Sequence, residues 1–397
     1  MRILHIATDN KFLDHAYPVF ERVYPGANEL FIFAPDESLK FVKQKPGLIE
    51  KKPRTVLRAR PKVSSETYQK YDLVVFHSLD ISIYPELKSV PKSIPTVWLG
   101  WGYDYYDVLP GDAPLLLKAT QALYSHLVEA RPRQILFRFI KKIMGGYDQS
   151  VGKIRAIEKV TIFCPVLPEE YEIVRNARRW RHFPKFAPWN YGTIEDNFIK
   201  GFEGESVTGD AILVGNSATF TGNHLEAFEL LRRLKMSGRQ IVVPLSYGNK
   251  ELATFLIDKG KEYFANEFES LTDFMPIEEY VAIIKRCGYV IMNHVRQQAV
   301  GNIVIMLYLG ARVFIRKENP VYDFFKQSGV ILSAVQELET YPKLLETPLT
   351  AEERLRNRTF VRHYWSRENA HERTQQLVEK AFSEKGLKIP EKSAGSY

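Results

Sequence analysis

One stretch of the chain, residues 290–320, constrains the fold more than any other. It reads VIMNHVRQQAVGNIVIMLYLGARVFIRKENP. An apolar run of strand length comes first. A polar turn, an apolar run of helical length that ends at Gly310, and a second short strand follow it. Strand, helix and strand in this order are typical of a parallel α/β sheet. We therefore expect an open sheet whose carboxyl edge carries the polar residues that follow each strand.

The polar turn within this stretch is a candidate anion site. Arg296, Gln297 and Gln298 stand just before the predicted helix. Free backbone amides at a helix start suit a phosphate, and an arginine can add a charge-assisted contact. A surface turn with an ordinary helix cap explains the same residues, so both interpretations stay open at this point.

Strands separated by helix-length segments recur in both halves of the chain. In the first half we expect strands at residues 2–7, 29–34, 71–76 and 95–99, and in the second at 211–214 and 240–243. A chain of 397 residues is also too long for one typical domain. We predict domains at residues 1–183 and 207–355, a linker at 184–206, and a charged helix at about 360–382 that can pack back on the first domain.

The composition indicates the charge of the binding partner but does not indicate which reaction the protein catalyses. The formal charge of +8 favours an anionic partner, which can be a nucleic acid, a membrane or a phosphorylated substrate. Only Cys164 and Cys287 are present, which argues against a disulfide framework and against a cysteine metal site. The sequence has no uncharged apolar run of about 18 residues, so we expect no transmembrane helix.

Three predicted strands of the first half end in residues that can do acid–base chemistry. Asp9 follows the first strand and His77 ends the third, while Asp104 follows the fourth strand beside the aromatic residues Trp101 and Tyr103. Aromatic faces can stack on a sugar while a carboxylate binds its hydroxyls or acts as a general base. The alternatives are a helix cap at Asp9, a structural histidine, and an aromatic turn packed against the core.

A basic amphipathic segment lies at residues 131–155, which hold seven Lys or Arg and one acid. Its apolar residues recur at helical spacing, and Arg138, Lys141 and Lys142 share another face. Such a helix can lie on an anionic membrane surface, or it can pack its apolar stripe on its own domain. Both interpretations remain open from these residues.

Five short motifs of the second half resemble those of one bacterial enzyme family. They are LVGNSATFTGNH, IVVPLSYGN, YVAIIKRCG, VRQQAVGN and RKENP, in this order. Together they resemble the TDP-4-acetamido-4,6-dideoxygalactose:lipid II transferases of enterobacterial common antigen synthesis, glycosyltransferase family 56. The resemblance covers about residues 210–322. In the first half only an H-x-x-x-D spacing that ends at Asp9, the strand-end His77 and W-G-x-D at 101–104 correspond.

The resemblance implies a GT-B architecture, with two Rossmann-like domains facing across a cleft. It also implies a metal-independent hexosyltransferase without a cofactor. The resemblance implies a reaction that moves a deoxyamino sugar or related hexose from a nucleotide-diphosphate donor, TDP-linked as in the family, onto a polyprenyl-diphosphate-linked saccharide in cell-surface glycan synthesis. Because that acceptor lies in the bilayer, the resemblance favours a peripheral protein on the cytoplasmic face of the bacterial inner membrane, with anionic lipid as a partner.

Candidate site residues follow from the motifs and the resemblance together. Asp104 is the first choice for the base, with Asp9 and His77 behind it, and Trp101 and Tyr103 should contact the acceptor. The membrane contact should involve Arg138, Lys141 and Lys142. The donor should be held by a larger set from the second half: Gly215, Asn216, Ser217, Tyr247, Arg296, Gln297, Gln298, Gly301, Asn302, Glu318 and Asn319. Arg296 and the helix amides would stabilise the leaving diphosphate in place of a metal.

Two functions of other classes fit the same composition. One is a basic protein that binds nucleic acid through its Lys and Arg runs, which would show strongly salt-dependent binding. The other is a protein that binds a nucleotide sugar without transferring it. Transfer of a sugar to a lipid acceptor would exclude both, and on the motifs we expect a glycosyltransferase with no nucleic-acid partner.

Overall fold

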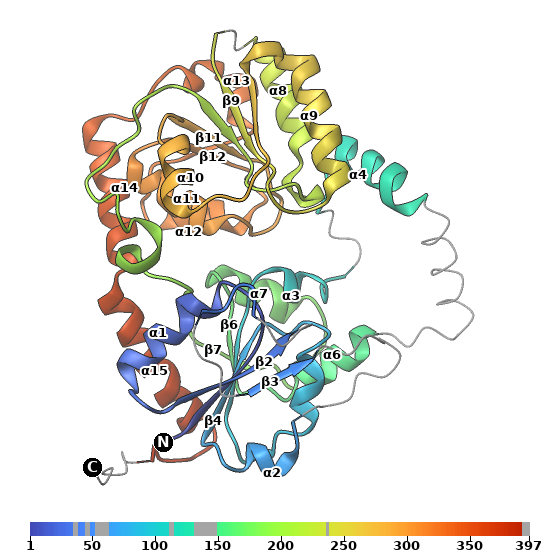
Figure 1. The fold of residues 1–397 in the computed structure, drawn as a ribbon, viewed down its shortest axis with the longest axis vertical. Coiled ribbons are helices and arrows are strands. Elements are labelled where there is room, and N and C mark those ends of the chain that lie inside the picture. Colours follow the sequence, from blue (N-terminus) through green and yellow to red (C-terminus); the bar gives the residue numbers. More distant parts are fainter. Residues whose placement is uncertain are drawn as a thin grey trace. The chain divides into compact units, whose positions relative to one another are not determined.

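The computed structural model describes residues 1–34, 39–43, 48–51, 63–110, 115–130, 149–235 and 238–390. The chain forms two compact units, each built on a parallel sheet (Figure 1). Unit 1 consists of Met1–Pro110, Asp148–Asn197 and Trp365–Tyr397, and unit 2 consists of Gly111–Tyr147 and Phe198–Tyr364. Each unit therefore gathers segments that are distant in sequence.

Unit 1 holds a seven-stranded sheet in the order β3-β2-β1-β4-β5-β6-β7. All its neighbouring strands run parallel. From β1 the chain adds strands first toward one edge of the sheet, as β2 and β3, and then toward the other edge, starting with β4. The carboxyl ends of β1 and β4 therefore form the topological switch point of the sheet. The strands are β1 (Ile3–Thr8), β2 (Asn28–Ala34), β3 (Leu48–Lys51), β4 (Leu73–His77), β5 (Thr96–Leu99), β6 (Ile162–Cys164) and β7 (Lys185–Phe186).

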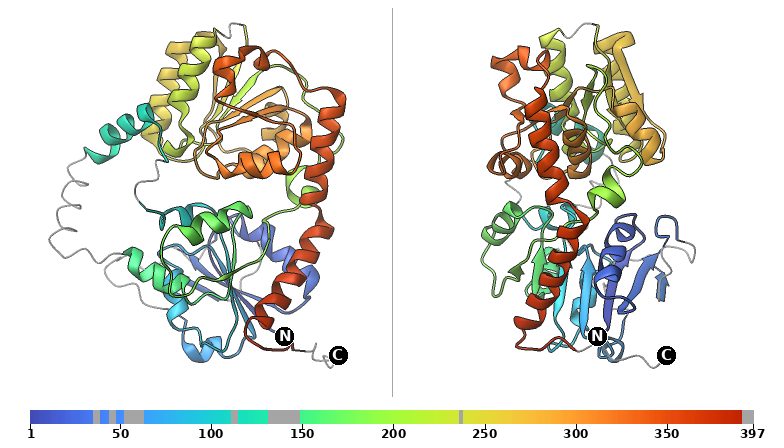
Figure 2. Two further views of the ribbon diagram at one scale, coloured as in Figure 1. Left: turned by 180° about the vertical axis from the view of Figure 1, so that it is seen from behind. Right: turned by 90° about the vertical axis from the view of Figure 1, so that its left-hand side faces the viewer.

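Alternate residues of this sheet build two separate cores, because successive side chains of a strand point to opposite faces. Trp98, Phe76 and Phe163 belong to one core, which also takes residues from α2 (Ser65–Tyr68), α3 (Tyr103–Tyr106), α6 (Gln149–Ile157) and α7 (Glu169–Asn176). The opposite core lies under α1 (Leu13–Val23) and α15 (Arg367–Ser383), which pack against each other (Figure 2). The last helix of the chain is thus part of unit 1.

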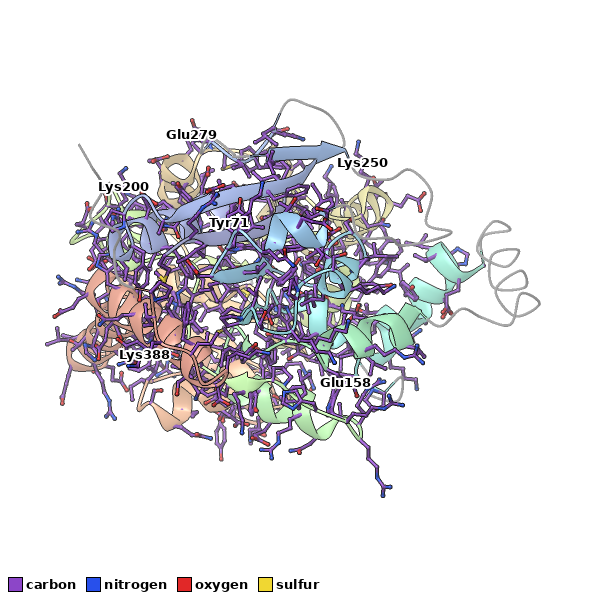
Figure 3. All side chains as sticks on the ribbon, turned by 90° about the horizontal axis from the view of Figure 1, so that it is seen from below. Tyr71, Glu158, Lys200, Lys250, Glu279 and Lys388 are labelled. Atoms are coloured by element: carbon purple, nitrogen blue, oxygen red, sulfur yellow. The ribbon has the colours of Figure 1, made fainter. Side chains whose placement is uncertain are left out.

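The amino-terminal edge of this sheet is held by exposed charged residues. Tyr71, just before β4, donates from its hydroxyl to Glu29 at 2.6 Å, and the Arg2 guanidinium lies over the Tyr71 ring (Figure 3). Arg2 also pairs with Glu29 at 2.6 Å, with both side chains more than 40% exposed. Ion pairs so open to water contribute little to stability. The opposite, carboxyl edge differs, because it includes the buried residues His77 and Asp104.

Unit 2 has the same strand order, β10-β9-β8-β11-β12-β13, and all its pairs are parallel. Its switch point lies between β8 and β11. The strands are β8 (Ile212–Val214), β9 (Ile241–Pro244), β10 (Phe268–Leu271), β11 (Tyr289–Met292), β12 (Arg312–Ile315) and β13 (Ser333–Ala334). Over the described residues its α-helices are α4 (Lys118–Tyr124), α8 (His224–Leu234), α9 (Lys250–Phe264), α10 (Ile277–Ile284), α11 (Val300–Leu309), α12 (Pro320–Gln327), α13 (Glu337–Thr340) and α14 (Ala351–Tyr364).

Helix α11 is the central helix of unit 2. Every residue from Ile303 to Leu309 is buried, and α14 packs against it. A helix that is apolar on all sides must be covered on all sides. Gly310 ends it with φ of +88°, a backbone conformation that a glycine adopts without strain. The other face of the sheet packs on α8 and α9.

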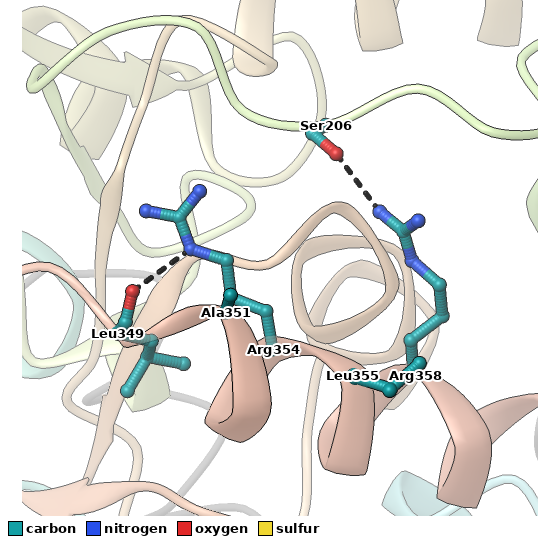
Figure 4. A pocket seen from close by; sticks show the side chains of 6 residues that line it. All are labelled: Ser206, Leu349, Ala351, Arg354, Leu355 and Arg358. Atoms are coloured by element: carbon teal, nitrogen blue, oxygen red, sulfur yellow. Dashed lines mark hydrogen bonds between the residues drawn. The ribbon is translucent and has the colours of Figure 1, made fainter.

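A pocket of about 470 Å³ lies along α14 (Figure 4). Arg354 and Arg358 line it, but their guanidinium groups donate to backbone carbonyls of Leu349, Tyr308 and Glu205. Ser206 also accepts a hydrogen bond from Arg358, at 3.0 Å. These arginines therefore fasten α14 to its surroundings, and the residues that line the pocket include none of the predicted site residues.

The structure confirms the predicted order of strand, turn, helix and strand at residues 290–320, and it confirms the six other predicted strands to within two residues at either end. The edge strands β3, β7, β10 and β13 were not predicted. An edge strand is buried less completely, so it needs no continuous apolar run. The charged C-terminal region forms two helices, α14 and α15, one in each unit.

Candidate functional site

Two turns meet at the switch point of unit 2. Residues 215–223 follow β8 and residues 293–299 follow β11, and we refer to them as the switch-point turns. Gly215 has φ of +66°, and Ala299, directly before α11, has φ of +63°. A non-glycine residue in the left-handed region is strained, and such strain is commonly retained at binding sites. In open α/β sheets this edge, at this reversal of strand order, is where ligands bind.

The Gln298 side chain ties the two switch-point turns together. Its Nε2 donates to Asn216 Oδ1 at 3.1 Å and to Thr219 Oγ1 at 2.9 Å. Its Oε1 accepts from the Thr221 hydroxyl at 2.7 Å. One amide thus uses both its donor and its acceptor to join the loops that follow β8 and β11. The structure therefore brings the predicted residues Gln298 and Asn216 together, although they are 82 positions apart.

Two asparagine–tyrosine pairs lie in the same region of unit 2. Asn216 donates from Nδ2 to the Tyr247 hydroxyl at 2.9 Å, and Asn302 donates to the Tyr280 hydroxyl at 3.3 Å. Tyr247 is 53% exposed, so its ring is available to a ligand. Sequence analysis did not predict Tyr280, because a tyrosine inside an otherwise apolar helix pattern is indistinguishable from a core residue.

Helices α8 and α11 begin at the switch-point turns without a side-chain cap. The neighbouring helices α9 and α12 are both capped by an asparagine, which accepts a hydrogen bond from a first-turn amide. Uncapped amino-terminal amides carry a partial positive charge and suit an anion. Ser217 is buried in the turn before α8, and Gly301 is in the first turn of α11, where a Cβ atom would come within 3.3 Å of the Phe198 ring.

The remaining predicted donor residues differ in their surroundings. Arg296 donates from Nη1 to the Gln297 carbonyl at 2.8 Å, and Gln297 is 6% exposed. Asn319 is fully buried, where it caps α12 and donates to the His294 carbonyl at 3.1 Å. The Asn319 side chain therefore stabilises the switch-point turn after β11 and is not exposed to a ligand.

Glu318 is exposed and bound on two sides, by Arg316 at 2.8 Å and by Gln336 at 2.7 Å. Although partial burial alone would raise the pKa of Glu318, the hydrogen bonds to its carboxylate and the Arg316 charge together outweigh it, and the net pKa is lowered. Arg316, which sequence analysis did not predict, also reaches Asn293 Oδ1 at 3.3 Å. It thus connects the end of β12 to the end of β11.

Two further residues at the switch point were missed, His224 and His294. His224 is the first residue of α8 and His294 follows β11, and both are buried. Each comes directly after an asparagine, Asn223 or Asn293. The repeated Asn-His dipeptide is the signal in the sequence by which the pair could have been found.

In unit 1, Asp104 is buried at the carboxyl edge of the sheet. Its Oδ2 accepts from the Leu79 amide and from Trp98 Nε1, both at 2.8 Å, and its Oδ1 accepts from the Trp101 amide at 2.7 Å. Burial raises the pKa of Asp104, against the opposing effects of Lys153 and of these hydrogen bonds. The carboxylate thus joins the turn after β4 to the turn after β5. Both turns are strained or glycine-dependent, with φ of +69° at Ser78 and +92° at Gly102.

Asp9 and His77 also hold parts of unit 1 in place. Asp9 accepts hydrogen bonds from the amides of Lys40, Phe41 and Val42, at 2.7 to 3.1 Å, and so fixes the segment that follows β2. His77 is fully buried, with Nε2 2.9 Å from His5 Nδ1 and Nδ1 3.0 Å from the Tyr191 hydroxyl. Burial, followed by the nearby His5 ring, lowers the pKa of His77 well below its ordinary value.

An aromatic cluster surrounds the predicted acceptor residues. Trp101 contacts Tyr103, Phe12 and Tyr191, with ring centroids 5.6 to 6.2 Å apart. Tyr103 is 46% exposed and Phe12 is 37% exposed, so part of this aromatic surface faces solvent. Phe12 and Tyr191 were not predicted, since neither lies in a motif with Trp101. The cluster and Asp104 are adjacent, because the carboxylate binds the backbone of Trp101.

The predicted membrane residues Arg138, Lys141 and Lys142 lie outside the described residues. Within the described part of the chain, no helix has both the length and the apolar character needed to cross a bilayer. The same described residues contain no cluster of three or more His, Cys, Asp or Glu side chains arranged to hold a metal ion.

Comparison with known sequences decides the class of this protein. Residues 196–342 match the family described as 4-alpha-L-fucosyltransferase, glycosyl transferase group 56. This match agrees with the resemblance to glycosyltransferase family 56 that the motifs carry. The protein is a glycosyltransferase. The matched region includes both switch-point turns and the turn that holds Glu318 and Asn319.

Solved structures support the fold of this glycosyltransferase along nearly its whole length. It is similar to the trehalose-6-phosphate protein of E. coli bound with UDP-2-fluoro glucose, at 8% identity and a TM-score of 0.62, with 96% of this chain and 98% of that one covered. The alpha,alpha-trehalose 6-phosphate synthase of Burkholderia multivorans matches at 8% identity, a TM-score of 0.59 and coverage of 96% and 98%. A co-structure of S. aureus MnaA with UDP matches at 10% identity, a TM-score of 0.52 and coverage of 98% and 99%.

These likenesses confirm the predicted fold class, an α/β protein of GT-B type with two Rossmann-like domains. At such low identity they establish the fold alone. The roles of single residues in the glycosyltransferase therefore rest on the geometry described above.

Proposed function

We propose that this glycosyltransferase moves a deoxyamino sugar or a related hexose from a nucleotide-diphosphate donor, TDP-linked in the first instance, to a polyprenyl-diphosphate-linked saccharide. One observation carries the donor half of the proposal. The Gln298 amide joins the two switch-point turns at the point where two helices begin without side-chain caps. A preformed turn with free backbone amides suits a diphosphate.

The comparisons support the chemical class of the donor. The matched family is described as a fucosyltransferase, and fucose is a 6-deoxyhexose. Two of the similar structures carry a uridine diphosphate compound, according to their descriptions. A deoxy sugar on a nucleoside diphosphate is therefore the donor that agrees with both the family and the fold.

Within the donor site, we expect each predicted group to bind a different part of the nucleotide sugar. Arg296 and the first amides of α11 would bind the diphosphate and stabilise the charge that develops as the sugar leaves. Tyr247, being exposed, would contact the sugar or the base. Glu318 would accept hydrogen bonds from ribose or sugar hydroxyls, since its carboxylate is oriented by Arg316 and Gln336.

The acceptor would bind at the aromatic cluster of unit 1. Tyr103 and Phe12, which both contact Trp101, present ring surface to solvent, and such faces stack on the C–H surface of a saccharide. Asp104, Asp9 and His77 remain the proposed acid–base groups. The three amide and indole donors around Asp104 favour a positioning role for this carboxylate, since it already holds the Trp101 turn.

A thermal-shift panel of nucleotide sugars tests the donor proposal. A ligand that binds only the folded protein raises its melting temperature. We expect TDP-linked hexoses to raise it more than UDP- or GDP-linked ones, and the best donor to support transfer to a polyprenyl-diphosphate-linked acceptor. A panel in which no nucleotide sugar shifts the melting temperature would contradict the proposed donor site.

The proposed location is the cytoplasmic face of the inner membrane, with residues 131–155 on anionic lipid. Changing Arg138, Lys141 and Lys142 together to Glu should release the protein from anionic vesicles, because each cation near the surface contributes about 1 kcal/mol. A matched control changes the exposed Arg175, Arg179 and Arg181 to Glu, which alters the net charge equally. Sedimentation with vesicles should separate the two variants. Equal pelleting of both with the wild type would remove this segment from the membrane contact.

A further inference from the structure

Two Asn-His dipeptides, distant in sequence, are joined at the switch point of unit 2. Asn223 and Asn293 exchange two hydrogen bonds, because the Nδ2 of each donates to the backbone carbonyl of the other, at 3.3 and 2.8 Å. The next residue in each case is a histidine, His224 or His294. The reciprocal bonds therefore hold the start of α8 against the end of β11 and bring the two histidines into one small region.

Both histidine rings are buried and lack hydrogen-bond partners among the residues that the structure describes. His224 is 2% exposed and His294 is fully buried. Within the described residues, no partner satisfies Nδ1 or Nε2 of either ring. A buried ring nitrogen without a partner is costly, and it needs an explanation where it occurs in a folded protein. Here two such rings lie in one region, directly at the turns that we assign to the donor.

The His224 ring lies against the turn that opens the donor site. A Cβ atom at either Gly215 or Gly222 would overlap this ring, so both positions exclude a side chain. Gly215 is the first residue of the switch-point turn after β8, and His224 is the first residue of α8. The ring thus lies under the backbone that begins an uncapped helix of 11 residues.

Few charges face this pair. Burial lowers the pKa of His224 to about 4, and burial, His224 and Arg296 together lower the pKa of His294. Arg316, which directly follows β12, bonds to Asn293 but is paired with Glu318. On α8, Glu226 accepts hydrogen bonds from the Thr120 amide and hydroxyl. Both rings are therefore neutral at pH 7 in the free protein, and among the described residues His224 and Arg296 act on the His294 ring.

We propose that His224 and His294 form a proton-accepting floor beneath the donor diphosphate, so that donor binding at the Gly215 turn draws a proton from solvent onto the ring pair. The proposal rests on the donor site of the proposed function. An incoming diphosphate brings two negative charges to the turn, and a nearby negative charge favours the protonated form of a histidine. The two histidines act through the turn, as positioning and electrostatic groups.

The stored proton has a use in the transfer step. When the bond between the anomeric carbon and the diphosphate oxygen breaks, its electron pair stays with that oxygen, and the diphosphate gains one negative charge. The acceptor oxygen forms the new bond to carbon and gives its proton to a base on the acceptor side. The proton on the ring pair is not consumed. It offsets the extra charge of the departing diphosphate and returns to solvent when the product leaves.

Calorimetric titration of the full-length protein with TDP-glucose and with UDP-glucose tests the inference. Both phosphates of these probes are esterified, so the ligand itself does not titrate near neutral pH. Repeating each titration at about pH 6 in buffers of different ionisation enthalpy gives the number of protons taken up. We expect uptake of about half a proton at pH 6, and binding about tenfold tighter at pH 5 than at pH 8, because a group whose pKa rises on binding strengthens binding as the pH falls.

Variants separate this role from a purely structural one. His224→Gln and His294→Gln should each reduce proton uptake and flatten the dependence of Kd on pH. The control is His363→Gln, on the exposed side of α14 in the same unit, which should leave both unchanged. Should a glutamine variant fail to fold, ring nitrogen shifts of ¹⁵N-histidine-labelled wild type, measured with and without the probe, report the same protonation.

The outcomes distinguish the inference from the proposed function. Binding with proton uptake that depends on His224 and His294 supports both. Binding without uptake, at a Kd that is constant from about pH 5 to pH 8, overturns the proton-accepting floor and leaves the donor site standing. If neither probe binds, both the proposed donor site and the proton-accepting role of His224 and His294 are contradicted.

Discussion

Each unit of this glycosyltransferase buries two histidines near the switch point of its sheet, and the two pairs are built differently. In unit 1, His5 and His77 contact each other at 2.9 Å, and their outer nitrogens reach Asn28 and Tyr191 at 3.1 and 3.0 Å. In unit 2, the rings of His224 and His294 have no hydrogen-bond partner within the described residues. Hydrogen bonds within unit 1 satisfy the ring nitrogens of the first pair. The ring nitrogens of the second pair have no such hydrogen bonds among the described residues.

The difference extends to the other polar residues of each edge. In unit 1, Asp104 and Asp9 use their carboxylates to fix nearby backbone, and the exposed surface is aromatic. In unit 2, the side chains of Asn216 and Gln298 bond to one another, while the amides that begin α8 and α11 stay uncapped. We infer that the edge of unit 1 is shaped for stacking on a neutral saccharide and the edge of unit 2 for holding an anion.

The largest expected effect breaks the satisfied pair. His77→Ala removes a buried ring and leaves His5 and Tyr191 without their partner, so we expect unfolding to become easier by about 3–5 kcal/mol. His294→Ala removes an equally buried ring but no ring hydrogen bond, so it should cost clearly less, about 1–3 kcal/mol. Denaturant titration of both variants measures the difference. Equal losses would show that the bonding of the unit 1 pair adds nothing to stability.

The second prediction asks what the Asp104 carboxylate does. Asp104→Asn turns one accepting oxygen into a donor that faces another N–H group, so we expect a loss of stability of about 2–3 kcal/mol together with a large loss of turnover. Donor affinity should be retained, because the change lies in unit 1. Unfolding and donor titration are measured on the same variant. Normal stability combined with lost turnover would instead make this carboxylate the base itself.

The third prediction concerns a substitution in the donor site that should leave the fold unchanged. Arg296→Ala should weaken donor binding by about 1.5–3 kcal/mol, the usual contribution of a hydrogen bond to a charged group, while unfolding changes little. Arg233→Ala is the control, since Arg233 lies in the same unit and pairs on the surface with Glu339. An unchanged donor Kd in the Arg296 variant would remove this side chain from the site.

The interior of both sheets could be predicted from the sequence, and the edges could not. Interior strands such as β4 and β11 are covered on both faces, so their residues form continuous apolar runs that are readily recognised. Edge strands are short and partly exposed, as in β7, where Lys185 faces solvent. Their pattern is too weak to distinguish from a loop.

The candidate site was predicted in part for a related reason. Motif residues such as Asn216 and Gln298 follow strands, and the parallel sheet brings strand ends together. The direction of a side chain does not follow from such a pattern. The W-G-x-D motif predicts an acid beside aromatic rings, but the burial of Asp104 depends on donors from Leu79 and Trp98, which belong to other turns and strands. Tyr191 joins the same cluster from a distant segment that no motif marks.

Hydrogen–deuterium exchange with and without a nucleotide sugar tests the central claim most directly, that the edge of unit 2 holds the donor. We predict that a saturating TDP-linked donor slows exchange of the backbone amides at residues 215–223 and 293–302, because the ligand occupies amides that have no partner in the helices they begin. Amides at residues 78–82 and 101–106 of unit 1 should exchange as before. Protection confined to these unit 1 turns, or absent from both edges at saturating donor, would contradict the account.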